Sequence, residues 1–171
     1  ARLLLAAAAA TGLALLARGA GLTEPLDLVA HDALVRWHAT APPSDRIALV
    51  TATEEDIGRF GWPLPDAVLA TLLDRLAAAG AGPIAVDLYR DRPVGDGAAQ
   101  LDAVLVRHPG ILWVTKLPEP PLPGVRPPAL LAGTPRAVAA DLVTDAGGVV
   151  RRGLIAGEDT ATGAVVRSLG A

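Results

Sequence analysis

Apolar and polar residues are patterned along this chain in segments that predict an α/β fold. An apolar, β-prone stretch, Ile47–Ala52, predicts a first strand and leads into an acidic turn, Glu54–Asp56. Leucines and valines at helical spacing predict a helix over Asp66–Ala79, which the glycines after it would end. A continuous apolar run, Pro83–Leu88, predicts a central parallel strand covered on both faces.

The second half of the pattern predicts one more helix and several more strands. A helix is expected over Ala98–Arg107 and a third strand over Ile111–Thr115. The proline-rich stretch Leu117–Pro135 is expected to be a surface excursion within one domain. Beyond it, Ala137–Val143 and Val149–Ala156 predict a hairpin around a glycine-rich turn.

These elements define a fold class. We predict a mixed sheet with a parallel β-α-β-α-β core and a C-terminal antiparallel hairpin, preceded by two N-terminal helices. In this arrangement Leu49 and Val86 lie in neighbouring, aligned strands. The last segment, Thr162–Leu169, is compatible with a final strand or with the first turns of a helix.

The N-terminus is uncharged and apolar or small over Leu3–Ala17. As a helix this segment would be roughly 22 Å long, short of the ~30 Å hydrocarbon core of a bilayer. A truncated membrane-anchor helix over residues 1–22 is favoured, while a signal-peptide segment and an alanine-rich soluble helix remain as alternatives. Residues 23–171 would then form the globular domain, with an amphipathic juxtamembrane helix that begins at Thr23 and ends at Ala41–Ser44.

Composition narrows the possible functions. The 171 residues suit a single core, and the lack of methionine indicates a piece of a longer protein. A net charge of −3 without a basic stripe argues against a nucleic-acid partner. Without cysteine, thiolate catalysis and disulfides are excluded, and Ser44 and Ser168 lack a nucleophile elbow. No histidine has metal-ligand spacing to another, so the histidines are expected to be structural and no metal site is predicted. No cofactor is predicted either.

One rigid corner, Gly61-Trp62-Pro63, joins the acidic turn to the helix that follows. A large aromatic ring dominates local burial energy, so the Trp62 ring is expected to fill the core there. The alternative is that the ring serves as a platform for a ligand.

The ends of the three predicted parallel strands would share one edge, where open α/β sheets bind ligands. The candidate ligand-binding residues at this edge are Thr51, Thr53, Glu54, Asp87, Arg90, Thr115 and Lys116. Such a mixed lining suits a small polar ligand or a hard cation. The alternative is that these residues only end strands and cap helices.

Several short motifs follow one another along the chain in a recognisable order: Asp32–Arg36, Ala41–Ile47, Glu54–Asp56, Phe60–Pro63, Ile84–Asp87, Asp91–Pro93 and Asp145–Arg152. This ordered set resembles the CHASE type-two domain, a sensory extracellular domain associated with cyclases and histidine kinases. The last segment fits the family's D-x-x-G-x-x-R signature with Asp145, Gly148 and Arg151, which together with the Gly61-Trp62-Pro63 corner are expected to be structural. The resemblance spans roughly Asp32–Ile155.

The chain departs from the family pattern at three places. Asp66 stands where an arginine usually follows the Trp-Pro corner, and Thr51-Ala52-Thr53 replaces an aspartate pair. Tyr89-Arg90 occupies a loop where the family prefers apolar and aromatic residues. Ligand chemistry cannot therefore be carried over from relatives.

The resemblance implies a bacterial receptor module outside the cytoplasmic membrane, with no chemistry of its own. It would control a cytoplasmic cyclase or kinase that lies outside this chain, and such outputs imply a homodimer. Its stimulus would be an unknown small ligand or a physical signal. A membrane-anchored metal-dependent hydrolase with an acidic strand-end site, and a structural dimerisation or spacer module, are the two alternatives.

Overall fold

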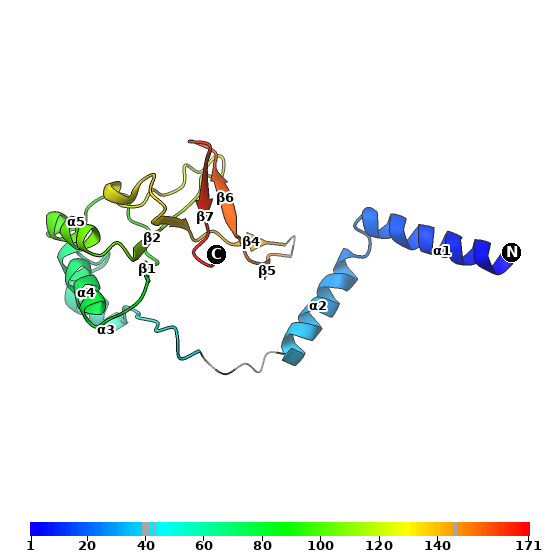
Figure 1. Ribbon diagram of the computed structural model, residues 1–171, viewed down its shortest axis with the longest axis horizontal. Helices are drawn as coiled ribbons and strands as arrows, with labels where there is room; N and C mark the ends of the chain where they lie inside the picture. Colours follow the sequence, from blue (N-terminus) through cyan, green and yellow to red (C-terminus); the bar gives the residue numbers. More distant parts are fainter. Residues whose placement is uncertain (39–41, 43, 146) are drawn as a thin grey trace. The chain divides into compact units, whose positions relative to one another are not determined.

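The computed structural model describes residues 1–38, 42, 44–145 and 147–171. The chain divides into two units, Ala1–Val50 and Thr51–Ala171. Figure 1 traces both units in colours that follow the sequence.

Two helices make up the first unit, as the sequence predicts. Helix α1 spans Arg2–Gly19 and helix α2 spans Glu24–His38, and neither has a buried residue. At 18 residues α1 is about 27 Å long, closer to the thickness of a bilayer core than the shorter segment expected from sequence. Across the turn between the helices, Arg18 forms an ion pair with Asp27 at 3.0 Å. The predicted stop of α2 falls partly on residues 41 and 43, which lie outside the described residues.

The predicted first strand, Ile47–Ala52, is wrong. This stretch has no strand pairing, and the Leu49 side chain is 86% exposed, so Leu49 and Val86 do not lie in neighbouring strands. The predicted acidic turn is instead the first turn of helix α3, Glu54–Phe60. Thr53 and Asp56 form a capping box at its start, and the acidic side chains there favourably meet the helix dipole.

The Gly61 corner ends α3. Gly61 has a φ of +82°, and its N–H donates to the carbonyl of Ile57. A glycine adopts this left-handed conformation without steric cost, which explains its place after a helix. The Trp62 ring next to it is 57% exposed, so the prediction that it fills the core is wrong.

The core of the second unit lies between two helices and one face of a sheet. Helices α4, Asp66–Ala78, and α5, Ala98–Arg107, confirm the two helices predicted there, and they pack against each other. Their buried leucines meet Ile111 and Trp113 of the sheet. The Trp113 side chain is fully buried, and its Nε1–H donates to the Leu88 carbonyl at 2.7 Å.

The sheet is parallel and three-stranded in the order β1-β2-β3. Strand β1 is Ile84–Val86, β2 is Ile111–Thr115 and β3 is Ala137–Ala139. The central strand is therefore β2, and β1, which was predicted to be central, lies at an edge. Strand β3, predicted as half of a hairpin, pairs with β2 instead, with Thr115 opposite Ala139.

Two antiparallel hairpins follow as separate two-stranded sheets. The first pairs β4, Val143–Thr144, with β5, Val150–Arg152, around the predicted turn, of which residue 146 lies outside the described residues. The second pairs β6, Ala156–Asp159, with β7, Ala164–Arg167. The last segment, Thr162–Leu169, for which the sequence allows a strand or a helix, therefore contains a strand, β7. The α/β class is confirmed, but the hairpins do not form one mixed sheet with the parallel strands.

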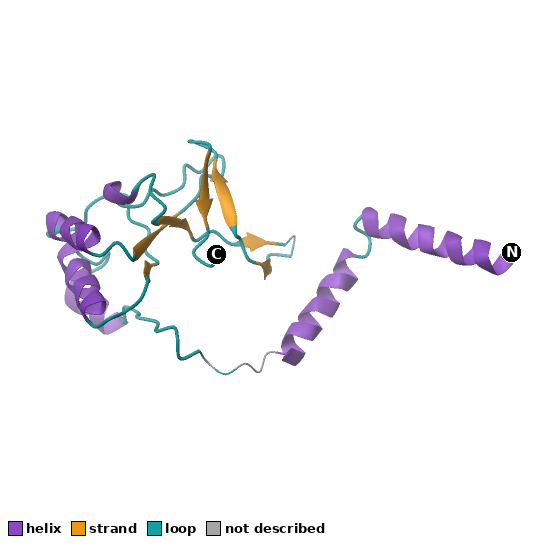
Figure 2. Cartoon of the chain, in the orientation of Figure 1, coloured by secondary structure: helices purple, strands orange, loops and turns teal. Residues whose placement is uncertain are grey.

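The long connection between β2 and β3 is the predicted proline-rich excursion, and it contains one 3-10 turn, η1, Ala129–Leu131. Figure 2 shows that within Thr51–Ala171 the helices α3 to α5 gather at one end and the hairpins at the other. After β7, the Leu169 N–H donates to the Ala139 carbonyl. This bond fastens the second hairpin beside β3.

Candidate functional site

The predicted strand-end residues fall into separate places in the structure. Thr53 is the N-cap of α3, where its hydroxyl lies 2.7 Å from the Asp56 carboxylate. The hydrogen bond from Thr53 lowers the pKa of Asp56 below its ordinary value. Glu54 is exposed in the same helical turn, and Thr51 is exposed just before it. Thr51, Thr53 and Glu54 therefore lie at the start of a helix and not at the end of a strand.

Arg90 is committed to a buried ion pair. Its guanidinium lies 2.5 Å from the Asp66 carboxylate and 2.6 Å from the Leu64 carbonyl, and the two charged side chains are 6% and 2% exposed. Asp66 also accepts the Val94 N–H. The arginine thus fastens the loop after β1 to the start of α4, while its neighbour Asp87 is exposed.

Thr115 and Lys116, at the carboxyl end of β2, line a cavity of about 630 Å³. Its other walls come from the proline-rich excursion and from the β6–β7 hairpin. This is the edge at which the sequence places a ligand, but the cavity is not lined by the other five candidates. Their proposed ligand role has no geometric support, and that of Lys116 remains a prediction.

The acidic residue of this cavity, Asp159, already has hydrogen-bond and ion-pair partners within the protein. Burial, the largest single effect, raises the pKa of its carboxyl, but hydrogen bonds and a neighbouring charge together lower it below the ordinary value. Those partners are the Ala161 N–H at 2.9 Å, Thr162, and the Arg126 guanidinium at 3.2 Å. Asp159 is therefore ionised and its lone pairs are largely occupied.

Sequence reasoning missed Asp159, Arg126 and Arg167 as part of this cavity. A signal was present: Asp159 and Gly163 frame a short turn between two runs that each suit a strand. The Thr162 and Gly163 N–H groups both donate to the Asp159 carbonyl and close this turn. The packing of that hairpin beside the excursion is a tertiary feature that the pattern does not contain.

The D-x-x-G-x-x-R signature closes the first hairpin. The buried Asp145 carboxylate accepts from Arg151 at 2.9 Å and from Arg152 at 2.6 Å. Gly148, with a φ of +73°, donates its N–H to the Asp145 carbonyl at 2.8 Å. A residue with a side chain would be strained in this conformation. The signature is thus a structural device that fixes a turn.

Acid should weaken this hairpin. The hydrogen bond from Arg151 has the largest effect on the pKa of Asp145. Together with the bond from Arg152, it holds this pKa below its ordinary value of 3.8. The stabilisation is fully present above that pH and is lost as the pH falls below it. We expect Asp145→Asn to destabilise the chain at neutral pH and the difference from the unsubstituted chain to shrink in acid. Urea unfolding at several pH values measures this; Asp102→Asn, on the exposed side of α5, is the control.

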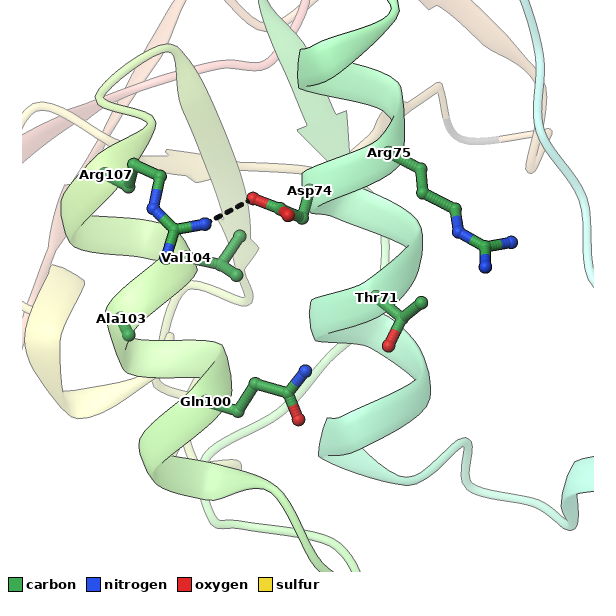
Figure 3. A pocket seen from close by; sticks show the side chains of 7 residues that line it. All are labelled: Thr71, Asp74, Arg75, Gln100, Ala103, Val104 and Arg107. Carbon is green, nitrogen blue, oxygen red and sulfur yellow. Dashed lines mark hydrogen bonds and ion pairs between the residues drawn. The ribbon is translucent and has the colours of Figure 1, made fainter.

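A second, smaller cavity of about 360 Å³ lies between α4 and α5 (Figure 3). The Asp74 carboxylate there lies 2.9 Å from His108 and 2.7 Å from Arg107. The hydrogen bond with His108, above all, lowers the pKa of Asp74. Arg107 is exposed and His108 is partly buried, and both link the end of α5 to α4, so the arrangement is that of a structural ion pair.

Metal chemistry finds no support in the described part of the chain. Among the residues that the structure describes, no three His, Asp or Glu side chains gather closely enough to hold a metal ion. The carboxylates that suggested a hydrolase are dispersed: Glu54 starts a helix, and Asp87 is exposed after β1. No observation in this structure favours the hydrolase alternative.

Comparison with known families agrees with the ordered motifs. The model of the CHASE2 domain matches residues 6–171, essentially the whole chain. The chain therefore belongs to the CHASE2 family, whose members are sensory extracellular domains of membrane receptors and are not catalytic. Searches of curated proteins and of solved structures give no match to it.

Proposed function

We propose that this chain is the signal-input domain of a bacterial transmembrane receptor that controls a cytoplasmic cyclase or kinase. The observation that carries the proposal is the CHASE2 match, because it includes most of α1, from residue 6, together with the α/β unit. The globular unit would lie outside the cytoplasmic membrane, in the periplasm or the extracellular space. The output enzyme would be outside this chain, and the receptor would act as a homodimer.

Helix α1 supplies the membrane anchor in this proposal. Among the described residues it is the one helix long and apolar enough to cross a bilayer. It carries charge only near its ends, at Arg2 and Arg18, and none of its residues is buried. A helix that is apolar between its charged ends is stable in lipid, where its backbone groups are bonded internally.

Signalling would start at the cavity beside β2. Ligand that binds one arrangement of the β6–β7 hairpin and the excursion more tightly than another shifts the population between them. The change would pass along the chain to α1 and α2 as a small helix shift at the dimer interface, one of the known switching motions. This coupling requires that the ligand bind the two arrangements with different affinities.

Reporter fusions test the location of the globular unit. With an initiating methionine and alkaline phosphatase fused after Ala171, we expect phosphatase activity in intact bacteria, because this enzyme folds only outside the cytoplasm. Placing arginine at Leu5 and Leu13 adds about 2.5–3.5 kcal/mol per residue to insertion and should lower the activity about tenfold or more.

The matched control places arginine at Leu26 and Leu34 in α2, both exposed, and should retain activity. A green fluorescent protein fusion that fluoresces while the phosphatase fusion is inactive would contradict the proposed location. A second experiment tests the output enzyme. This domain replaces the sensor domain of a related receptor cyclase, and regulated cyclase activity in the fusion would support the proposed role.

A further inference from the structure

The cavity beside β2 points to a specific class of ligand. We propose that it binds a small organic carboxylate, whose head is held by Lys116 and Arg167 and whose apolar part lies along the proline-lined wall. This inference rests on the proposed sensory function and names the ligand of that same site.

Three cationic side chains line the cavity: Lys116, Arg126 and Arg167. One of them, Arg126, is already paired with Asp159, which is the acidic residue of the lining. Asp159 also accepts hydrogen bonds from the turn that follows it. This pair is therefore close to neutral by itself and leaves the other two cations without a counter-charge from Asp159.

Lys116 and Arg167 are the free cations of the site. Among the residues that the structure describes, neither side chain has a hydrogen-bond or ion-pair partner. The nearby Asp141 carboxylate accepts the Leu117 N–H at 3.0 Å and forms no ion pair with Lys116. Two positive charges in the wall of one cavity favour an anion, and an arginine in particular suits the two oxygens of a carboxylate.

The rest of the lining selects for an apolar body. Pro118, Pro123 and Pro127 offer ring carbons and no N–H. The hydroxyl of Thr115 already donates to the Val125 carbonyl, and that of Thr134 to the Leu131 carbonyl. Few neutral donors remain for a sugar-like ligand, so polar recognition falls on the two cations. A volume of about 630 Å³ lies within the usual range for small-molecule sites.

Calorimetric titration of the full chain in detergent tests the proposal. Butyrate is the carboxylate probe, butyramide is its neutral counterpart, and inorganic phosphate is an oxyanion without an apolar part. We expect butyrate to bind at least about tenfold more tightly than butyramide and than phosphate. Lys116→Gln and Arg167→Gln should each weaken butyrate binding by about tenfold, because each removes a charge-assisted contact.

Arg92→Gln is the matched control, since Arg92 is 84% exposed, does not line the cavity and should leave binding unchanged. Thermal unfolding without butyrate should be alike for all variants, which separates lost binding from lost folding. Equal binding of butyramide, tighter binding of phosphate, no binding of butyrate, or no effect of either cavity substitution would each overturn the proposal.

Failure of the ligand class can be told apart from failure of the sensory function. A globular unit that is exported in the fusion experiment but does not bind butyrate retains its proposed function and loses only this ligand. A unit that binds butyrate through Lys116 and Arg167 but stays in the cytoplasm retains the site and loses the receptor role.

Discussion

Replacing Arg90 with methionine is expected to lower the free energy of unfolding by about 3–5 kcal/mol, the usual cost of removing one partner of a buried ion pair. The Asp66 carboxylate, 2% exposed, would lose its counter-charge, and the Leu64 carbonyl would lose a donor. Urea unfolding of the full chain, followed by circular dichroism, gives the measurement.

Two further variants make this prediction specific. Arg92→Met removes a solvent-exposed arginine from the same loop and should change stability by less than about 0.5 kcal/mol. Asp66→Asn combined with Arg90→Met should recover part of the loss, because no charge is then left buried without a partner. A cost for Arg90→Met as small as that for Arg92→Met would show that the pair does not hold the loop.

Trp113→Ala is expected to cost about 3–5 kcal/mol of stability, whereas Trp62→Ala should cost less than about 1 kcal/mol. Both variants replace a tryptophan with alanine in the same chain, so they differ only in where the lost indole ring lies. Trp113 is fully buried between the helices and the sheet, and Trp62 is 57% exposed. The comparison therefore measures burial directly, by urea unfolding of each variant.

Trp113→Phe separates packing from hydrogen bonding. It keeps most of the ring but removes the Nε1–H that donates to the Leu88 carbonyl, which should cost about 1–3 kcal/mol. An equal loss of stability in Trp62→Ala and Trp113→Ala would contradict the structure and restore the interpretation of Trp62 as the core aromatic residue.

The elements with correctly predicted bounds are those in which the spacing of apolar residues matches the buried positions. Helix α5 and strand β2 have the predicted bounds, Ala98–Arg107 and Ile111–Thr115. In α5 the buried positions, Leu101, Val104 and Leu105, repeat at helical spacing. In β2 a run of five apolar or β-branched residues leaves no helical face. Local sequence and final environment agree there.

The predicted first strand failed because β-propensity needs a partner. Ile47 and Leu49 have the composition of a strand, but no neighbouring strand pairs with them, and their side chains are exposed. The competing local signal was available in the sequence. Thr53, followed three residues later by Asp56, is a capping pattern that predicts a helix start.

The candidate site was only partly predictable for a similar reason. The rule that parallel strands share one functional edge correctly placed Thr115 and Lys116 at the carboxyl end of β2. It failed for Thr51, Thr53 and Glu54, because their supposed strand is absent. It also failed for Arg90, whose charge is satisfied by Asp66 from another element.

Two departures from the family pattern have one structural explanation. Asp66 stands where an arginine is usual, and Arg90 stands in a loop that usually carries apolar and aromatic residues. In the structure these two side chains are each other's partners. Neither substitution is interpretable alone, since each would bury an unpaired charge.

The sequence by itself determined the α/β class, the apolar N-terminal helix, the buried faces of α4 and α5 and the family to which the chain belongs. These follow from local periodicity and from the order of short motifs. Tertiary structure decided which tryptophan is buried, that β3 joins the parallel sheet, and that Lys116, just after β2, and Arg167, in β7, line one cavity. Such features depend on which surfaces of the protein contact each other. Contacts between segments far apart in the sequence do not change the hydrophobic periodicity of either segment, so the pattern does not predict them.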